Sequence, residues 1–155
     1  MQHLGHRLIA LPLLVPTLAA SAALAGSSAS IHLRGVVPQV CSVSVQDRGV
    51  VFDLGAAGQA RSVAAIEERC NAPAGYTVTL SSRNGGELRP ETGTGGSGLP
   101  YVMTYEGATA AGAGRVVANR PPGVETKDLF VETGAAGNLP SGSYEDTIVV
   151  TVEAK

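Results

Sequence analysis

The stretch GSYEDTIVVTVEAK (142–155) decides the fold class, because its side chains alternate with a period of two. One parity carries Tyr144, Ile148, Val150 and Val152, and the other carries Glu145, Thr147, Thr151 and Glu153. Such alternation is typical of a β-strand with one buried and one solvated face. We therefore expect a strand here whose apolar parity forms part of a hydrophobic core.

The same pattern recurs earlier in the chain. It is clear in GYTVTLSS (75–82) and LPYVMTYEG (99–107), while GVVFDLG (49–55) and DLFVETG (128–134) predict shorter strands. RSVAAIEERC (61–70) permits either a helical turn or a strand, and RNGGEL (83–88) predicts a turn because Asn-Gly readily adopts positive φ. Short strands separated by glycine and proline favour an antiparallel all-β domain.

Length and charge narrow the class of protein. The chain has 155 residues, which suggests one domain, and it contains no tryptophan and 4% aromatic residues. Its net charge of −2 is scattered along the chain. We therefore expect no binding to nucleic acid and no electrostatic attraction to anionic membranes.

Residues 1–25 are typical of a signal peptide. The segment carries one formal charge, Arg7, then an apolar run, and it ends in Ala23-Leu24-Ala25, which fits small-x-small cleavage. No later segment approaches the ~20 apolar residues that span a bilayer, so no stable membrane span is expected after cleavage. The sequence thus predicts an exported protein with an N-terminal segment at 26–40 and a β-domain at 41–155.

Cys41 and Cys70 are the only cysteines. In an exported chain such a pair predicts a disulfide, and closing this loop would contribute ~3.5 kcal/mol in the chain-entropy model. The cysteines could instead serve redox chemistry or bind a metal. Both alternatives are disfavoured, because there is no CxxC motif and His32 is the only histidine after residue 25.

We find no set of residues that predicts catalysis. GTGGSG (93–98) matches the dinucleotide fingerprint GxGxxG, but no helix is expected after it to hold a pyrophosphate. The acidic neighbours Glu67-Glu68 and Glu145-Asp146 should point to opposite faces of a strand, and His32 is expected in solvent. We therefore expect a protein that is not an enzyme and has no cofactor or metal site.

The stretch ASIHLRGVVPQVC (29–41) is a second alternating segment. Its odd positions Ala29, Ile31, Leu33, Gly35 and Val37 carry no polar side chain. A hydrophobic strand near a terminus needs an edge to pair with, and the segment 144–153 leaves one because no strand follows it. The pairing could occur between molecules or within one chain, and the residues alone leave both possibilities open.

The chain resembles the spore coat protein U domain family, which includes pilin subunits of the archaic chaperone–usher pathway. The likeness lies in the strand leading into CSVSV (41–45), a second cysteine shortly before GYTVTLSS, the LPYVMTYEG strand, and the ending LPSGSYEDTIVVTV (139–152). It covers most of the chain after residue 25. The resemblance rests on the order and spacing of these motifs.

The resemblance implies an immunoglobulin-like antiparallel β-sandwich that lacks its last strand. A periplasmic chaperone would fill the gap first, an outer-membrane usher would assist export, and the N-terminal strand of a neighbouring subunit would then replace the chaperone. The donor residues would be Ala29, Ile31, Leu33, Gly35 and Val37, and Tyr144, Ile148, Val150 and Val152 would contribute to the acceptor groove or core. The expected function is a structural subunit of a surface fibre, and the alternative is a monomeric binding module that completes its own sandwich.

Overall fold

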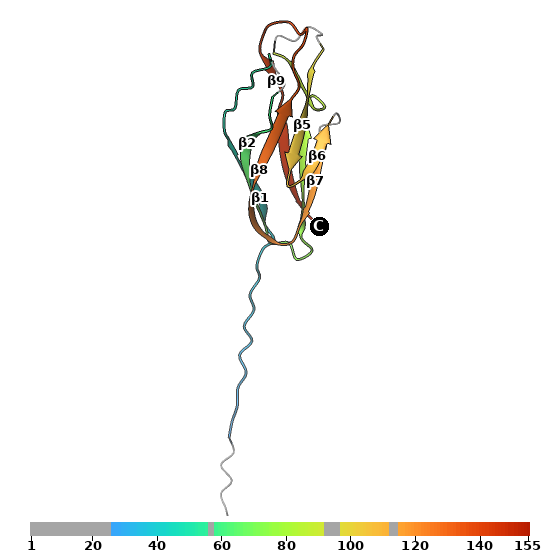
Figure 1. Cartoon of the computed structure of the whole chain (residues 1–155). Coiled ribbons are helices and arrows are strands. Elements are labelled where there is room, and N and C mark those ends of the chain that lie inside the picture. The colour runs from blue at the N-terminus through green and yellow to red at the C-terminus, as the bar shows by residue number, and fades with distance from the viewer. Residues whose placement is uncertain (1–25, 56–57, 92–96, 112–114) are drawn as a thin grey trace, which may run out of the picture. The chain divides into compact units, whose positions relative to one another are not determined.

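The computed structural model describes residues 26–55, 58–91, 97–111 and 115–155. Within these ranges the chain forms ten β-strands, arranged in two antiparallel sheets that enclose one core (Figure 1). The expected all-β, antiparallel fold class is therefore confirmed. The signal peptide predicted at 1–25 lies outside the described residues.

The larger sheet has the strand order β1-β2-β8-β5-β4-β9, and β6 pairs with β5. Its strands are β1 (Cys41–Asp47), β2 (Arg61–Cys70), β8 (Gly123–Thr133), β5 (Leu99–Tyr105), β4 (Glu87–Pro90), β9 (Tyr144–Glu145) and β6 (Ala108–Ala111). The smaller sheet has the order β10-β3-β7 and consists of β10 (Ile148–Ala154), β3 (Tyr76–Ser82) and β7 (Arg115–Arg120). Consequently β1 and β10 are edge strands of two different sheets.

The core lies between the inward parities of the two sheets. β3 contributes Tyr76, Val78 and Leu80, and β5 contributes Leu99, Tyr101, Met103 and Tyr105, all of them buried. These are the residues that the alternation in GYTVTLSS and LPYVMTYEG predicts. Both strands are therefore half-buried, as a two-layer sandwich requires.

The ambiguous segment RSVAAIEERC is a strand rather than a helical turn. It forms β2, which pairs with β1 on one side and with β8 on the other. The register places Cys41 opposite Cys70, and the two cysteines form the predicted disulfide. The bridge thus joins the first two strands of the domain.

Two predictions about strands were wrong or incomplete. GVVFDLG is not a strand: the β1–β2 ladder ends at Asp47–Ala64, and Gly49 at a φ of 61° turns the chain away, so that Val51 is 83% exposed. The glycine-rich region 85–123 holds β4, β6 and β7 in addition to the predicted β5. Most of the GTGGSG segment (93–98) falls on residues 92–96, which lie outside the described residues.

The final segment is also not the single strand that its alternation predicts. Tyr144–Glu145 pairs with β4 in the larger sheet, whereas Ile148–Ala154 pairs with β3 in the smaller one. The chain crosses between the sheets at Asp146 and Thr147. The alternation continues across this crossing because β9 and β10 both direct their even-numbered apolar side chains, such as Tyr144 and Ile148, inward.

Residues 26–36 form a unit separate from the domain of residues 37–155. No strand or helix is assigned to residues 26–36, and the side chains of Ile31 and Leu33 are 87% and 93% exposed. In the part of the chain that the structure describes, no helix has the length and apolar character to cross a membrane.

Candidate functional site

A groove lies between the edge strands β1 and β10, and we call it the β1–β10 groove. Strand β1 has a ladder partner only on its β2 side, and β10 only on its β3 side. Each strand therefore presents one row of backbone N–H and C=O groups that no other described strand pairs. Two open edges that flank one groove form a site that can accept an added strand.

The inward parity of β1 shows that the core beneath this groove is uncovered. Val45 lies opposite Ile66 in the ladder, so both side chains are on the same face of the sheet. Ile66 is fully buried, whereas Val45 is 51% exposed. A valine directed toward the core and half exposed indicates that the neighbouring layer is missing at this point.

The groove has a volume of about 760 Å³. Its apolar lining includes Phe52, Leu88, Leu129, Val131, Ile148 and Val150. Phe52, Leu88, Ile148 and Val150 are only partly buried and pack against the core cluster. The groove is thus a hollow in the hydrophobic core, and an apolar side chain entering it would be transferred from water into that core.

The two ends of the groove differ. We call the end where β1 begins and β10 finishes the base: here Cys41 is bonded to Cys70, and the Lys155 N–H donates to the Gly75 carbonyl at 3.0 Å. The groove lining does not extend to Cys41 or Val152. We call the opposite end, lined by residues 50–54 and 142–147, the open end.

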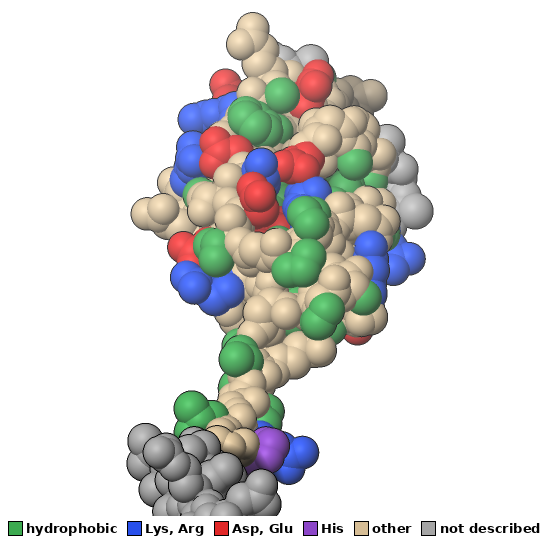
Figure 2. Space-filling view, turned by 90° about the horizontal axis from the view of Figure 1, so that it is seen from below, with side chains coloured by type: hydrophobic (Ala, Val, Ile, Leu, Met, Phe, Trp, Pro, Cys, Tyr) green, Lys and Arg blue, Asp and Glu red, His purple; other side chains and the backbone are tan. Residues whose placement is uncertain are grey.

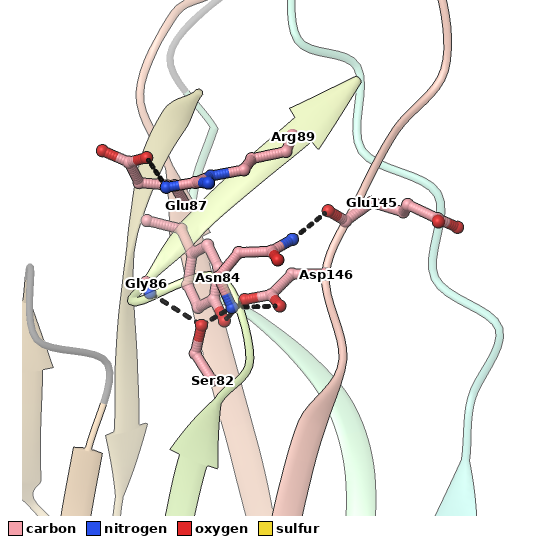
Figure 3. Close-up of polar contacts among 8 residues, drawn as sticks. Ser82, Asn84, Gly86, Glu87, Arg89, Glu145 and Asp146 are labelled. Carbon is pink, nitrogen blue, oxygen red and sulfur yellow. Dashed lines mark hydrogen bonds and ion pairs between the residues drawn. The ribbon is translucent and has the colours of Figure 1, made fainter. Parts of the chain in front are cut away.

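Asp146 fixes the geometry of the open end (Figure 3). Its Oδ1 accepts the backbone N–H groups of Asn84 and Thr147 at 3.0 and 2.7 Å. Its Oδ2 accepts the hydroxyls of Tyr101, at 2.6 Å, and Ser82. Burial and the bond to Asp146 raise the pKa of the Tyr101 hydroxyl well above its usual value near 10, so it remains a donor at neutral pH.

Two further bonds extend this network to the turn between β3 and β4. The Gly86 N–H donates to Ser82 Oγ at 2.7 Å, and Asn84 Nδ2 donates to the Glu145 carbonyl at 3.1 Å (Figure 3). The turn contains the predicted Asn-Gly pair, and Gly85 has the expected positive φ, 73°. Hydrogen bonds therefore connect the crossing from β9 to β10 with the β3–β4 turn at the open end.

Asp146 and Tyr101 bond to each other instead of presenting a free acid and base to the groove. Among the described residues, no group of three or more His, Cys, Asp or Glu side chains is arranged to hold a metal ion. The groove offers an apolar surface, with the acidic residues Asp47, Asp53 and Glu145 also in its lining, and two backbone edges. That combination suits binding of an extended peptide.

The predicted acceptor residues occupy three different places. Ile148 and Val150 of β10 line the groove. Val152 packs against the core but does not line the groove. Tyr144 also lines the groove, but it does so from β9 in the larger sheet, and its hydroxyl donates to the Pro140 carbonyl at 2.8 Å.

The predicted donor residues lie before the domain or at its first residue. Ala29, Ile31, Leu33 and Gly35 belong to the separate N-terminal unit, and Val37, the first residue of the domain, is 84% exposed. Immediately after Val37 the chain is held by Asn71. The Val40 N–H donates to Asn71 Oδ1 at 2.7 Å, and Asn71 Nδ2 donates to the Pro38 carbonyl at 2.9 Å.

Sequence reasoning missed part of the groove and one buried cluster. Val45 belongs to the recognised CSVSV alternation. Phe52 lies in GVVFDLG, which was predicted to be a strand but is not one, and Leu88 lies in RNGGEL, which was predicted to be a turn. The cluster centres on Glu68, which is fully buried and accepts hydrogen bonds from the hydroxyls of Tyr76 and Tyr105 and from Arg120 Nε. Its neighbour Glu67 is exposed, as expected for adjacent residues in a strand.

No protein-family model and no curated protein matches this sequence.

Proposed function

We propose that this protein is an exported structural subunit of a surface fibre, and that it polymerises by inserting its N-terminal segment into the β1–β10 groove of another copy. The observation that carries the proposal is the uncovered core at Val45, between two open strand edges. A groove of this kind needs an apolar strand, and residues 29–37 supply an alternating one. Insertion would bury Ile31 and Leu33, worth ~2 kcal/mol each.

The polarity of the inserted strand follows from the ends of the groove. An inserted terminal strand stays connected to its own domain at its C-terminal end, and this connection must leave the groove. The disulfide and the Lys155–Gly75 bond lie at the base, whereas the groove lining reaches residues 50–54 and 142–147 at the open end. Val37 would therefore sit at the open end, and the strand would run antiparallel to β10.

This polarity favours exchange between molecules over self-completion. The protein's own N-terminal segment joins the domain at the base, where Asn71 holds Pro38 and Val40. To enter its own groove with the proposed polarity, the segment would first have to travel the length of the domain. When the base of one copy is joined to the open end of a second copy, the open end of the first copy remains free. A third copy can bind there, so the assembly grows as an open filament instead of closing as a dimer.

The proposal includes partners during export. A groove that exposes core side chains is an aggregation hazard until a strand fills it. A periplasmic chaperone that supplies a temporary strand and an outer-membrane usher that exchanges it are the partners that the family resemblance implies. Export would thus take the protein through the periplasm to the cell surface.

A peptide-binding experiment tests the proposal. The full exported chain carrying both Ile31→Asp and Leu33→Asp should be unable to donate its strand but should keep an intact groove. A synthetic peptide of residues 29–40 should bind this variant and raise its melting temperature. The matched control is a peptide of the same composition in which Ile31 and Leu33 exchange places with Ser30 and Arg34, so that both apolar side chains move to the outward parity.

Polymer formation gives the second readout. The unsubstituted protein should form polymers in size-exclusion chromatography, and the doubly substituted variant should not. If the unsubstituted protein is instead a stable monomer, ignores the added peptide and is destabilised by the two substitutions, the segment completes its own sandwich. The self-complemented binding module would then replace the fibre subunit.

A further inference from the structure

The base of the domain carries a hollow that is separate from the β1–β10 groove. It has a volume of about 460 Å³ and is lined by residues that include Val40, Arg69, Asn71, Pro122 and Val124. Val40 and Val124 are each 51% exposed. Figure 2 views this end of the domain, where hydrophobic side chains lie among charged ones.

The connection between the N-terminal segment and the domain is too short to keep the base away from a neighbouring copy. From Val37 to Cys41 the chain takes four Cα-to-Cα steps, which span at most roughly 14 Å. Asn71 already ties Pro38 and Val40 to the base. When Val37 occupies the open end of an acceptor, the base of the donor must therefore lie against that end.

The open end presents side chains that suit the hollow. The side chain of Val51 is 83% exposed, although the Arg61 guanidinium donates a hydrogen bond to the Val51 carbonyl at 3.0 Å. Asp53 is exposed two residues later. At the base, the Arg69 side chain is 58% exposed, and its guanidinium lies 3.6 Å from the Glu67 carboxylate of its own chain. An exposed valine and a carboxylate are thus available to meet an apolar hollow with a guanidinium at its rim.

We propose that consecutive copies make a second contact, in which the base hollow of one copy binds Val51 of the next copy, with Arg69 facing Asp53. This contact rests on the proposed strand exchange, because only the exchange brings the two ends together. It makes the hollow a docking site for a second copy of this chain. The inserted strand joins the copies, and the contact at the base fixes the angle between them.

Engineered cysteines test the contact. The full exported chain carrying both Val51→Cys and Val124→Cys should form a ladder of covalent multimers on a non-reducing gel after mild oxidation. The new cysteines lie at opposite ends of the domain, so a bond between them must join two molecules. The matched control carries Val117→Cys with Val124→Cys, because Val117 is also exposed, at 43%, but lies on β7. It should give no ladder.

Charge reversal gives an independent readout. Arg69→Asp or Asp53→Arg alone should speed the loss of subunits from polymers about two- to fivefold, in line with an exposed ion pair, and the two together should restore the original rate. Polymers without a cysteine ladder and without this rescue would overturn the contact and leave strand exchange intact. Absence of polymers, with no peptide binding by the donor-deficient variant, would overturn both proposals.

Discussion

Glu68 shows how a single buried charge can hold the two layers together. Its carboxylate accepts bonds from Tyr76 of β3, Tyr105 of β5 and Arg120 of β7. Arg120 in turn contacts Glu106 at 2.8 Å, and its own side chain is only 10% exposed. Each oxygen of Glu68 is thus partnered, which a fully buried carboxylate requires. The cluster links strands of both sheets, and Glu68 lies opposite Val43 of β1 in the β1–β2 ladder.

The tyrosines of this cluster make the stability of the domain sensitive to alkaline pH. Burial, with the nearby Glu68 charge and its hydrogen bond, raises the pKa of Tyr76 to about 12, and burial also raises the pKa of Tyr105 above its usual value. A raised pKa means that the folded state retains the proton more tightly than the unfolded chain. The associated stability is therefore complete below pH 10 and is lost as the pH rises from 10 toward 12.

Urea denaturation between pH 8 and 12 checks this prediction. The free energy of unfolding should fall above pH 10 by up to about 1.4 kcal/mol per pH unit for each tyrosine that is protonated only in the folded state. Tyr105→Phe should be less stable at pH 8 but should show a shallower alkaline decline. A decline equally steep in this variant would show that Tyr105 does not contribute to it.

The buried role of Glu68 could not be predicted from the sequence. Glu67 and Glu68 are adjacent, and only the parity of a strand decides which of them faces the core. The parity can be assigned only if RSVAAIEERC is known to be a strand. Its alanines and glutamates are equally compatible with a helical turn, so the sequence did not decide between the two. The partners are also distant in sequence, since Arg120 lies 52 residues away.

At the scale of elements, the division of the last segment into β9 and β10 shapes the groove. Because Tyr144 pairs within the larger sheet and Ile148 begins in the smaller one, the crossing at Asp146 connects the two layers at the open end of the groove. The register of β10 places Val150 opposite Leu80 and Thr151 opposite Thr79. Val150 therefore faces both the core and the groove, whereas Thr151 faces solvent.

Matched substitutions on β10 test this register. Val150→Asp should place an unpaired charge against Leu80 and should prevent accumulation of folded protein. Thr151→Asp should change the free energy of unfolding by no more than about 0.5 kcal/mol, as is usual for a surface position. Protein yield and urea denaturation measure the two effects. Equal sensitivity at both positions would show that the register is wrong.

The strands that sequence patterning identified are those with a long apolar parity. In β3 and β5 every second side chain is buried, so the alternation is visible without a structure. β6 and β7 are short and rich in alanine, valine and polar residues, and β4 is four residues long. They are strands because longer neighbours pair with them. The apolar run of GVVFDLG was misleading because its residues line the groove without joining a ladder.

At the scale of the whole molecule, the two chain ends of the domain meet at the base. The last strand ends there beside Gly75, and β1 begins there at Cys41 (Figure 1). A strand that enters the groove antiparallel to β10 would start close to the C-terminus. It could then be supplied by the same chain through an ordinary hairpin connection of two to five residues.

A rearranged chain tests this geometry. Residues 26–37 moved behind Lys155, through a linker of about four glycine and serine residues, should fill the groove of their own molecule. The product should be monomeric in size-exclusion chromatography and more stable to heat than the protein in its natural order with Ile31→Asp and Leu33→Asp. Introducing the same two substitutions into the rearranged segment should abolish the gain. A rearranged protein that still polymerises would contradict the proposed polarity.

The position of the disulfide has a mechanical consequence. In a fibre under tension, the pull on each subunit would enter the domain through residues 38–41, which follow the exchanged segment and end at Cys41. The bond to Cys70 passes this load directly to β2, which is flanked by β1 and β8. β1 would then not peel away from β2 starting at the base. The force would instead act as shear along β2. A fibre of such subunits would extend at the contacts between copies before any domain unfolded.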